Sequence, residues 1–358
     1  MHRCAMLRST MRTSSSASER SSVSSSTDAS SKSSVPADLY ICVDAGGTKT
    51  AAVVANGDGV IVGSARGGSA NMAELGLDEA ARAIIETVDK AMEGLDMGEV
   101  LEIWAGVSGC DTPNDALLMT GRLRSVFPAC EVKVTNDALL LSAPLQSAQV
   151  HWGVALISGT GSIAVRLEHT RGGYCATQKR GGYGHLFGDP GSGYHLGLEA
   201  IRAAAEDADR GGKSILGQRL AQAFGTEHIE DVPAKAHDMP IAPDPVTSSN
   251  NRKLRIAQLA PLVLELACTA APGRPCPVAR RAVDAVSDSL VGYVRDLALS
   301  PGNAGAVVLS GGLGTEPTFA RIFQARLGVD GFDMPVLFAK SPAESGAVMM
   351  AKGPGFAP

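Results

Sequence analysis

The sequence predicts an α/β protein of two lobes that repeat one order of elements. Three glycine-rich turns each follow a short apolar, β-branched run of the kind that forms buried strands. Antiparallel-type strands, followed by strands separated by helical stretches, occur once in each half of the 358-residue chain, which predicts a mixed sheet in each half. The length suffices for two cores. The turns are Asp44-Ala-Gly-Gly-Thr-Lys-Thr50, Ser158-Gly-Thr-Gly-Ser162 and Ser310-Gly-Gly-Leu-Gly314.

Apolar periodicity and turn residues predict the individual elements. Apolar runs indicate strands, and recurrence every three or four residues indicates helices. Asn56-Gly-Asp-Gly59 is a strong hairpin signal between two strands. In the first half we expect strands at 39–43, 50–55, 60–64, 102–107 and 131–135, and helices at 77–94 and 114–126. In the second half we expect strands at 152–157, 163–167, 306–309 and 335–339, and helices at 193–209, 253–271 and 277–299.

The composition is that of a globular protein, with 44% hydrophobic and 19% charged residues. The net charge of -5 and the lack of basic runs argue against a nucleic-acid partner. No apolar stretch is long enough to predict a membrane span. The seven cysteines are scattered without a Cys-x-x-Cys pair, which favours reduced thiols in an intracellular, cytoplasmic chain. A zinc or iron–sulfur site would need distant cysteines to converge.

The chain divides into a tail and two lobes. Residues 1–37 are rich in serine and poor in apolar residues, so we expect a disordered tail; their arginines leave a mitochondrial presequence as the alternative. We expect residues 38–148 to form the first lobe and 149–342 the second, with 343–358 packing back onto the first. We interpret segment 226–251, which is rich in proline, aspartate and serine, as an excursion of the chain over the surface (a surface loop).

The first glycine turn has the composition of a phosphate-binding hairpin. Gly46 and Gly47 allow backbone N–H groups to approach phosphate oxygens, and the hydroxyl of Thr48 can donate to one. Asp44 is placed to hold a hydrated Mg²⁺, since hard cations keep waters and take one or two carboxylates. We interpret Lys49 as a surface charge. The alternative reading is an ordinary tight hairpin.

The second turn is expected to face the first across a cleft and to hold the outer phosphates of a nucleotide. Gly159 and Gly161 give backbone access, and Thr160 is the best side-chain donor, followed in the turn by Ser162. Neither turn has the Gly-x-x-x-x-Gly-Lys spacing of a P-loop. Here too a simple hairpin turn is the alternative.

Five segments, taken together, resemble the N-acetylglucosamine kinases. Those enzymes group with bacterial glucosamine kinases and the benzoyl-CoA reductase activating ATPases in the sugar-kinase, actin and heat-shock-chaperone superfamily. The resemblance covers about residues 39–353 and implies a duplicated ribonuclease-H-like, actin-like ATPase fold, with ATP and Mg²⁺ bound in a cleft between the lobes. The segments are Asp44-Ala-Gly-Gly-Thr48, Thr135-Asn-Asp-Ala138, Ile157-Ser-Gly-Thr-Gly-Ser162, the loop from Gly181 to Gly193, and Ser310-Gly-Gly-Leu313.

The resemblance assigns the catalytic base to Asp137. This residue ends a strand of alternating valines, where a side chain can project from the sheet edge into a cleft. Phosphoryl transfer to a hydroxyl needs a group that orients the attacking oxygen and accepts its proton. From local sequence alone, the alternative is that Asp137 caps a helix beginning at Ala138.

The resemblance also places the sugar and the adenosine. Asn71 matches the family's sugar-binding asparagine, and Gly311 and Gly312 match its adenosine-side motif. The second sugar-binding segment contributes Gly182, Tyr183, Gly184 and Asp189. Two positions depart from the family. Tyr183 stands where many relatives have tryptophan, which keeps an aromatic ring, and Pro190 replaces an acid, which removes a carboxylate from the site's edge.

The expected activity is therefore ATP-dependent phosphorylation of an amino sugar, most simply N-acetyl-D-glucosamine at O6. Glucosamine or another hexose is an alternative substrate, and an activating-type ATPase or a non-catalytic sugar sensor is an alternative function. The expected partner is a small sugar, and the resemblance is compatible with a homodimer. We expect His185 and His195 to pack or hydrogen-bond rather than to bind a metal.

Overall fold

The computed structural model describes residues 38–95, 100–237, 252–269, 275–298 and 305–353. The predictions for residues 1–37, 238–251 and 354–358 lie outside these ranges.

The strands are β1 (Leu39–Ala45), β2 (Thr50–Asn56), β3 (Ile61–Gly67), β4 (Val100–Val107), β5 (Glu131–Asn136), β6 (Trp152–Ser158), β7 (Ser162–Thr170), β8 (Gly173–Gly181), β9 (Ala306–Ser310) and β10 (Val336–Ala339). The helices are α1 (Met72–Leu75), α2 (Leu77–Ala91), α3 (Pro113–Val126), α4 (Ser142–Ser147), α5 (Gly193–Asp209), α6 (Ile215–Phe224), α7 (Val232–His237), α9 (Ala260–Thr269), α10 (Pro277–Ala298), α11 (Pro317–Val329) and α12 (Pro342–Lys352), with short 3₁₀ turns η1 (Asp137–Leu141), η2 (His185–Phe187) and η3 (Ile229–Asp231).

The ten strands form two five-stranded sheets of identical topology. The first has the order β3-β2-β1-β4-β5 and the second the order β8-β7-β6-β9-β10. In each, the first strand pairs antiparallel with the second, and the second with the third, while the two later strands add in parallel. The predicted duplication is therefore confirmed at the level of sheet topology.

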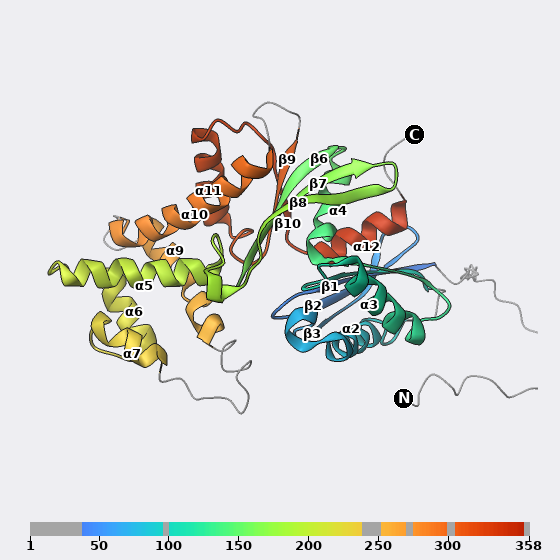
Figure 1. The fold of residues 1–358 in the computed structure, drawn as a ribbon, viewed down its shortest axis with the longest axis horizontal. Coiled ribbons are helices and arrows are strands. Elements are labelled where there is room, and N and C mark those ends of the chain that lie inside the picture. Colours follow the sequence, from blue (N-terminus) through green and yellow to red (C-terminus); the bar gives the residue numbers. More distant parts are fainter. Residues whose placement is uncertain (1–37, 96–99, 238–251, 270–274, 299–304, 354–358) are drawn as a thin grey trace, which may run out of the picture. The chain divides into compact units, whose positions relative to one another are not determined.

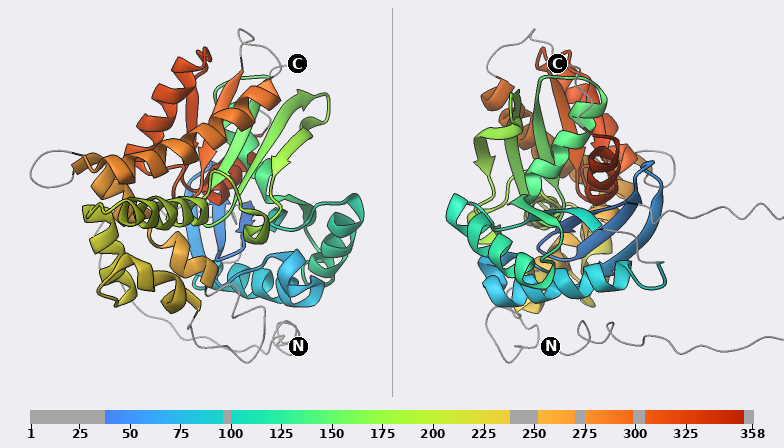
Figure 2. Two further views of the ribbon diagram at one scale, coloured as in Figure 1. Left: turned by 60° about the vertical axis from the view of Figure 1, so that its left-hand side comes forward. Right: turned by 90° about the vertical axis from the view of Figure 1, so that its right-hand side faces the viewer.

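Helices cover both faces of each sheet (Figures 1 and 2). In the first sheet, α2 and α3 share a core with one face, and α12 packs on the other face around Cys42 and Trp104. In the second sheet, the larger core lies under α5, α6, α9, α10 and α11. Carboxyl ends of parallel strands meet at one edge of such sheets, and that edge is where ligands bind in open α/β folds.

The segment from η1 through α4 joins the cores of the two sheets. Leu140 packs with α12 and the first sheet, while Leu141 and Leu145 pack with the second. All three leucines are fully buried. Asp137 is the first residue of this segment, so its backbone is held by both halves of the fold.

Several elements differ from the sequence prediction. Strand β8 was not expected, because its residues Ala176 to Arg180 are mostly exposed and polar and carry no apolar alternation. The helix expected at 253–271 is interrupted by a turn at Gln258–Leu259, after which α9 begins. The excursion expected at 226–251 contains η3 and α7, which are anchored by buried Ile229 and Val232.

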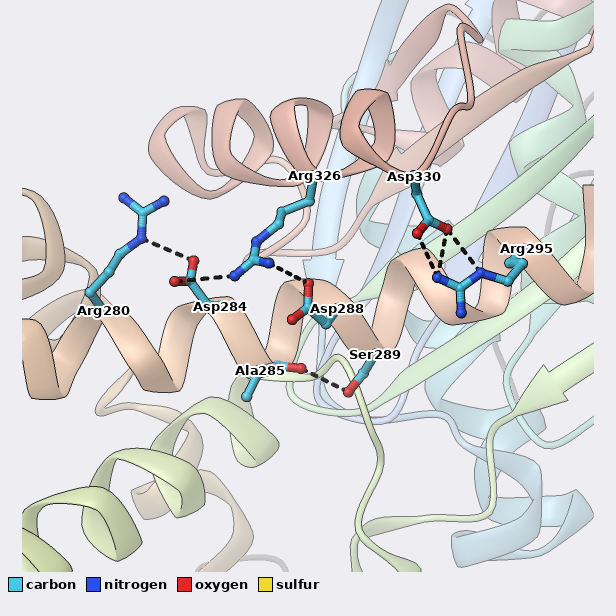
Figure 3. Close-up of polar contacts among 8 residues, drawn as sticks. All are labelled: Arg280, Asp284, Ala285, Asp288, Ser289, Arg295, Arg326 and Asp330. Carbon is cyan, nitrogen blue, oxygen red and sulfur yellow. Dashed lines mark hydrogen bonds and ion pairs between the residues drawn. The ribbon is translucent and has the colours of Figure 1, made fainter. Parts of the chain in front are cut away.

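Ion pairs connect α10 to α11 on the surface of the second half (Figure 3). The Arg326 guanidinium lies 3.2 Å from Asp284 and 3.1 Å from Asp288, and Arg295 makes a bidentate contact to Asp330 at 2.6–2.9 Å. Because these side chains are partly exposed to solvent, we expect the pairs to contribute little to stability.

Within the described ranges, no helix combines the length and the apolar character that crossing a bilayer requires.

Gly346 determines how closely α12 approaches the first sheet. A Cβ atom at this position would lie 2.5 Å from Cys42 Sγ and 3.6 Å from the Trp104 ring. We expect Gly346→Ala to lower the free energy of unfolding by about 1–3 kcal/mol, because the core cannot take the added volume. Gly292→Ala in α10 is the matched control, since its Cβ meets nothing within 4 Å and it should be neutral or gain up to about 1 kcal/mol. Urea unfolding of both variants measures the difference, and equal midpoints would contradict this packing.

Candidate active site

A pocket of about 800 Å³ lies at the carboxyl ends of the parallel strands of both sheets. The wall includes residues that follow β1, β4 and β5 in the first sheet and β6 and β9 in the second. The predicted site residues that line it are Asp44, Gly46, Gly47, Thr48, Asn71, Asp137, Gly159, Thr160, Gly161, Ser162, Gly182, Gly184, Asp189, Gly311 and Gly312. Three separate glycine turns and the loop before α5 therefore converge on one cavity.

In the first turn, the hairpin itself uses one of the N–H groups that the sequence assigned to a ligand. Gly46 N–H donates to the Lys49 carbonyl at 3.0 Å, which leaves the exposed Gly47 and Thr48 facing the pocket. The Gly46 carbonyl accepts from Ala70 N–H at 3.1 Å and so holds the following loop against the turn. Lys49 was expected to be only a surface charge; it lines the pocket and favours the ionised form of Asp44, lowering its pKa against the effect of burial.

Two carboxylates form the acidic part of the pocket. Burial raises the pKa of Asp44 to about 6. Burial, followed by the nearby charge of Asp44, raises the pKa of Asp137 to about 7. Asp111 adds a smaller repulsion in the same direction. A carboxylate whose ionisation is disfavoured by burial and by a neighbouring acid, as for Asp137, favours the arrival of a cation or of a proton donor.

The helix-cap alternative for Asp137 is not needed, because Asn136 fills that role. Asn136 Oδ1 accepts from Ala138 N–H at 3.0 Å, and its Nδ2 donates to Asp111 Oδ1 at 3.0 Å. Gly106 in β4 lies directly behind Asp137, since a Cβ there would be 3.1 Å from the Asp137 Cα. The Asp137 carboxylate is thus directed into the pocket by the residue before it and by a strand packed behind it.

The second and third turns are braced by buried hydroxyl and backbone hydrogen bonds. Ser158 Oγ donates to the Gly191 carbonyl at 2.6 Å, and Ser162 Oγ donates to the Pro190 carbonyl at 2.7 Å. The Ser158 carbonyl in turn accepts from Leu313 N–H at 3.0 Å and Gly314 N–H at 2.8 Å. Ser162, which was predicted to contact phosphate, lines the pocket, and its hydroxyl also links the turn to the loop before α5.

Backbone donors of the second turn are also partly used within the protein. Gly159 N–H donates to the Gly161 carbonyl at 2.9 Å, within the turn itself. The Gly159 carbonyl accepts from Gly193 N–H at 2.7 Å, at the start of α5. All four residues from Gly159 to Ser162 nevertheless line the pocket.

The sugar-side residues come from both halves of the chain. Asn71 caps α1, with its Oδ1 accepting from Ala73 N–H at 2.9 Å, and its Nδ2 lies close to Gly47. Asp189 is buried and has a left-handed backbone, with φ of 40°, a conformation that Asp tolerates better than most residues. Tyr183 is 72% exposed and is not part of the pocket wall, so stacking on a sugar would require its loop to move inward.

The two histidines behave as expected. His195 Nδ1 accepts from Gly191 N–H at 3.1 Å, and burial lowers its pKa. His185 stacks edge-on with Tyr194, with ring centroids 5.5 Å apart. In the described parts of the chain, no three His, Cys, Asp or Glu side chains cluster in a way that could hold a metal by themselves.

Sequence reasoning missed the wall formed by α9 and the residues before it. Ala257, Pro261, Leu264 and Leu313 give this side of the pocket an apolar surface beside Gly311 and Gly312. Lys253 lines the pocket at the start of the preceding helical turn. A basic residue at a helix start opposes the helix dipole, and that was the one local signal that could have marked Lys253.

The comparisons with known proteins agree with this architecture. The chain is 30% identical over 242 residues to the N-acetyl-D-glucosamine kinase of Dictyostelium discoideum, with 64% of this chain and 71% of that kinase aligned. It is 33% identical over 183 residues to the N-acetylmuramic acid/N-acetylglucosamine kinase of Clostridium acetobutylicum. This second match covers 49% of this chain and only 56% of the length of that relative.

Among solved structures, a candidate N-acetylglucosamine kinase from Chromobacterium violaceum matches with a TM-score of 0.62 at 22% identity, over 88% of this chain and 99% of that one. A ROK family glucokinase from Streptomyces griseus, solved with glucose and AMPPNP, matches with a TM-score of 0.55 at 18% identity, over 87% and 97%. These likenesses confirm the predicted two-lobed, actin-like ATPase fold. The family model that describes the BadF/BadG/BcrA/BcrD ATPases matches residues 41–351. The chain belongs to the BadF/BadG/BcrA/BcrD ATPase family, and membership implies that it uses ATP.

Proposed function

We propose that the protein transfers the terminal phosphoryl group of ATP to a hydroxyl of an amino sugar, with N-acetyl-D-glucosamine as the substrate and O6 as the acceptor. One observation carries the proposal: Asp137 lines the same pocket as the glycine turns suited to phosphates and as Asn71 and Asp189, which are suited to a sugar. The names of the Dictyostelium and Clostridium relatives support an amino sugar over other hydroxyl acceptors.

The proposed roles follow from placement. The apolar wall at α9 and the Gly311–Gly312 turn would receive the adenosine, and the first two turns would receive the phosphates. Asn71, Gly182, Gly184 and Asp189 would hold the sugar, since amide and carboxylate groups satisfy neighbouring hydroxyls. Tyr183 is included as a sugar contact in the state in which its loop has moved inward. Asp137 orients the attacking hydroxyl and accepts its proton.

The acidic residues suit a Mg²⁺ ion that ATP brings with it. Asp44 and Asp137 are partly buried carboxylates whose pKa values are raised by burial, and a nearby divalent cation would remove that cost. Mg²⁺ commonly uses one or two carboxylates together with phosphate oxygens and waters, so a cage of three protein ligands is not required. We assign Asp44 as the protein's ligand. When bound, the ion offsets negative charge that develops during transfer.

We also assign residues 38–148, together with residues 343–353 of the described ranges, to the first lobe and 149–342 to the second. The packing of α12 on the first sheet supports this division. The homodimer and the cytoplasmic location expected from the sequence stay predictions.

Coupled ADP release with Mg-ATP tests the activity across a sugar panel. The panel contains N-acetylglucosamine, N-acetylmuramic acid, N-acetylmannosamine, glucosamine and glucose, with a no-sugar control. We expect turnover to depend on sugar and to be greatest with N-acetylglucosamine. Greater turnover with glucosamine or glucose would reassign the substrate. ADP release that is equal in every well, control included, would overturn the kinase in favour of an activating-type ATPase.

A further inference from the structure

Lys253 occupies a position in the pocket that close backbone packing determines. The helical turn that carries it, residues 252–257, lies against α5. A Cβ at Gly197 of α5 would lie 2.9 Å from the Ile256 backbone carbon, and one at Gly193 would lie 3.5 Å from the Ala257 carbonyl oxygen. Because Gly193 and Gly197 have no side chain, the backbone of this turn can contact α5 directly. Lys253, at the start of the turn, lines the pocket.

The ammonium group of Lys253 lies beside the second glycine turn. Its Nζ is 4.0 Å from the position that a Cβ of Gly161 would take, and Asp189 Oδ2 is 2.9 Å from the same point. The turn is thus flanked by one cation and by the carboxylate expected to meet the sugar.

The charge of Lys253 acts on two neighbouring side chains, Asp189 and His185. The charge of Lys253 favours the ionised carboxylate of Asp189, lowering its pKa against the opposing effect of burial. It also adds to burial in lowering the pKa of the His185 imidazole. Lys49, which lines the first turn, and Lys340, which follows β10, are the other lysines of the pocket wall in the described residues.

We propose that Lys253 is a further catalytic residue, whose ammonium binds the outermost phosphate of the nucleotide and stays with that group as it moves to the sugar. This inference rests on the proposed function. In the step, the bond from the acceptor oxygen to the γ-phosphorus forms and the bond from that phosphorus to the β,γ-bridging oxygen breaks. The hydroxyl proton passes to the Asp137 carboxylate, and the electron pair of the broken bond remains on ADP.

The chemistry of this position explains why a cation is useful there. The transferred group carries its charge on three equatorial oxygens, and enzymes stabilise that charge with fixed positive groups. Gly161 lets the backbone of the second turn come close to a phosphate, but the turn itself carries no formal charge. A lysine beside it adds a full positive charge as a flexible, point-like donor, which suits phosphate.

The test compares the binding of AMPPNP with that of ADP, since the two ligands differ by the terminal phosphate. For Lys253→Met we expect AMPPNP to bind at least about tenfold more weakly, while the Kd for ADP changes less than about threefold. Lys253→Arg should keep most of the preference for AMPPNP. Lys213→Met, at an exposed position before α6, is the matched control and should bind both ligands as the unmodified protein does. Lys253→Gln serves as the second neutral variant if the Met variant does not fold.

Turnover provides the second readout. In the N-acetylglucosamine assay, kcat of Lys253→Met should fall by about 10²–10³-fold, with less change in KM for the sugar. Unchanged relative binding of AMPPNP and ADP in the neutral variants would overturn the proposal. So would a loss confined to KM for N-acetylmuramic acid, because Lys253 would then bind a sugar carboxylate. Since nucleotide binding is measured without sugar, a failure of the proposed sugar kinase activity is distinguishable from a failure of this inference.

Discussion

Replacement of Asp137 by asparagine is expected to lower kcat by about 10²–10⁴-fold while nucleotide and sugar still bind. The amide has the shape of the carboxylate but cannot accept the proton of the attacking hydroxyl. Asn136 Oδ1 caps the following turn, and the side-chain oxygen of an asparagine at 137 can still accept the backbone hydrogen bonds that the Asp137 carboxylate receives, so the substitution removes the base and keeps the local structure. Steady-state kinetics together with AMPPNP titration separates the two effects.

The matched control for this change is Asp58→Asn, at an exposed position in the hairpin between β2 and β3, which should leave kcat unchanged. If Asp137→Asn retains full turnover, the carboxylate is not the base, and the assignment by resemblance fails. If the variant also loses nucleotide binding, Asp137 stabilises the structure of the pocket and is not a base.

The same substitution is expected to raise stability, with a defined pH dependence. Burial and Asp44 raise the pKa of Asp137 from 3.8 to about 7. Between those values the folded protein binds a proton that the unfolded chain has released, so the free energy of unfolding falls as pH rises. The loss is complete above about pH 7. In EDTA at pH 8, Asp137→Asn should therefore be more stable by roughly 1–3 kcal/mol, and the gain should vanish near pH 4. Thermal unfolding across pH 4–8 measures it, and a gain that is independent of pH would contradict the burial of this charge.

Gly311→Ala is expected to abolish nucleotide binding and to lower the free energy of unfolding by roughly 2–4 kcal/mol. Gly311 has φ of 84°, where any other residue is strained. Its Cβ would also lie 2.5 Å from the Ser158 carbonyl carbon and 2.7 Å from Gly159 N. Backbone on the opposing turn cannot move away as a side chain could, because Ser158 is held by Leu313, Gly314 and Gly191.

The neighbouring glycine gives the control for stability. A Cβ at Gly312 meets nothing within 4 Å, so Gly312→Ala should unfold at nearly the temperature of the unmodified protein. If calorimetry shows the two variants to be equally stable, close contact between the second and third turns does not hold the pocket. That result would contradict our explanation of why a glycine is needed at position 311.

Most of the fold was predictable because its signals are local. Each glycine turn follows an apolar strand, and the repeat of hairpin and crossover elements predicts the two equivalent sheets that the structure contains. Strand β8 escaped prediction because it has neither the apolar alternation nor the burial of the other strands. It forms through backbone pairing with β7, which propensity does not reveal.

The site was predictable in outline but not in its hydrogen bonding. Glycine content identified the turns, yet only the structure shows that Gly46 and Gly159 donate within their own turns and that the Ser162 hydroxyl donates to Pro190. These partners are set by tertiary contacts between segments about 30 residues apart or by the turn's own geometry. Lys253 could not be placed because its position depends on the packing of its helical turn against α5, where Gly197 meets Ile256, 59 residues later in the chain. The roles assigned to the pocket residues stay predictions.

The most direct test of the central claim is to determine where the phosphoryl group goes. Phosphorus NMR of the protein with Mg-ATP and N-acetylglucosamine follows the products as they form. We predict a sugar phosphomonoester, coupled to the C6 protons, that accumulates in step with ADP and is nearly absent with Asp137→Asn. Accumulation of inorganic phosphate at the same rate with and without sugar, and with no phosphomonoester signal, would contradict transfer to a sugar.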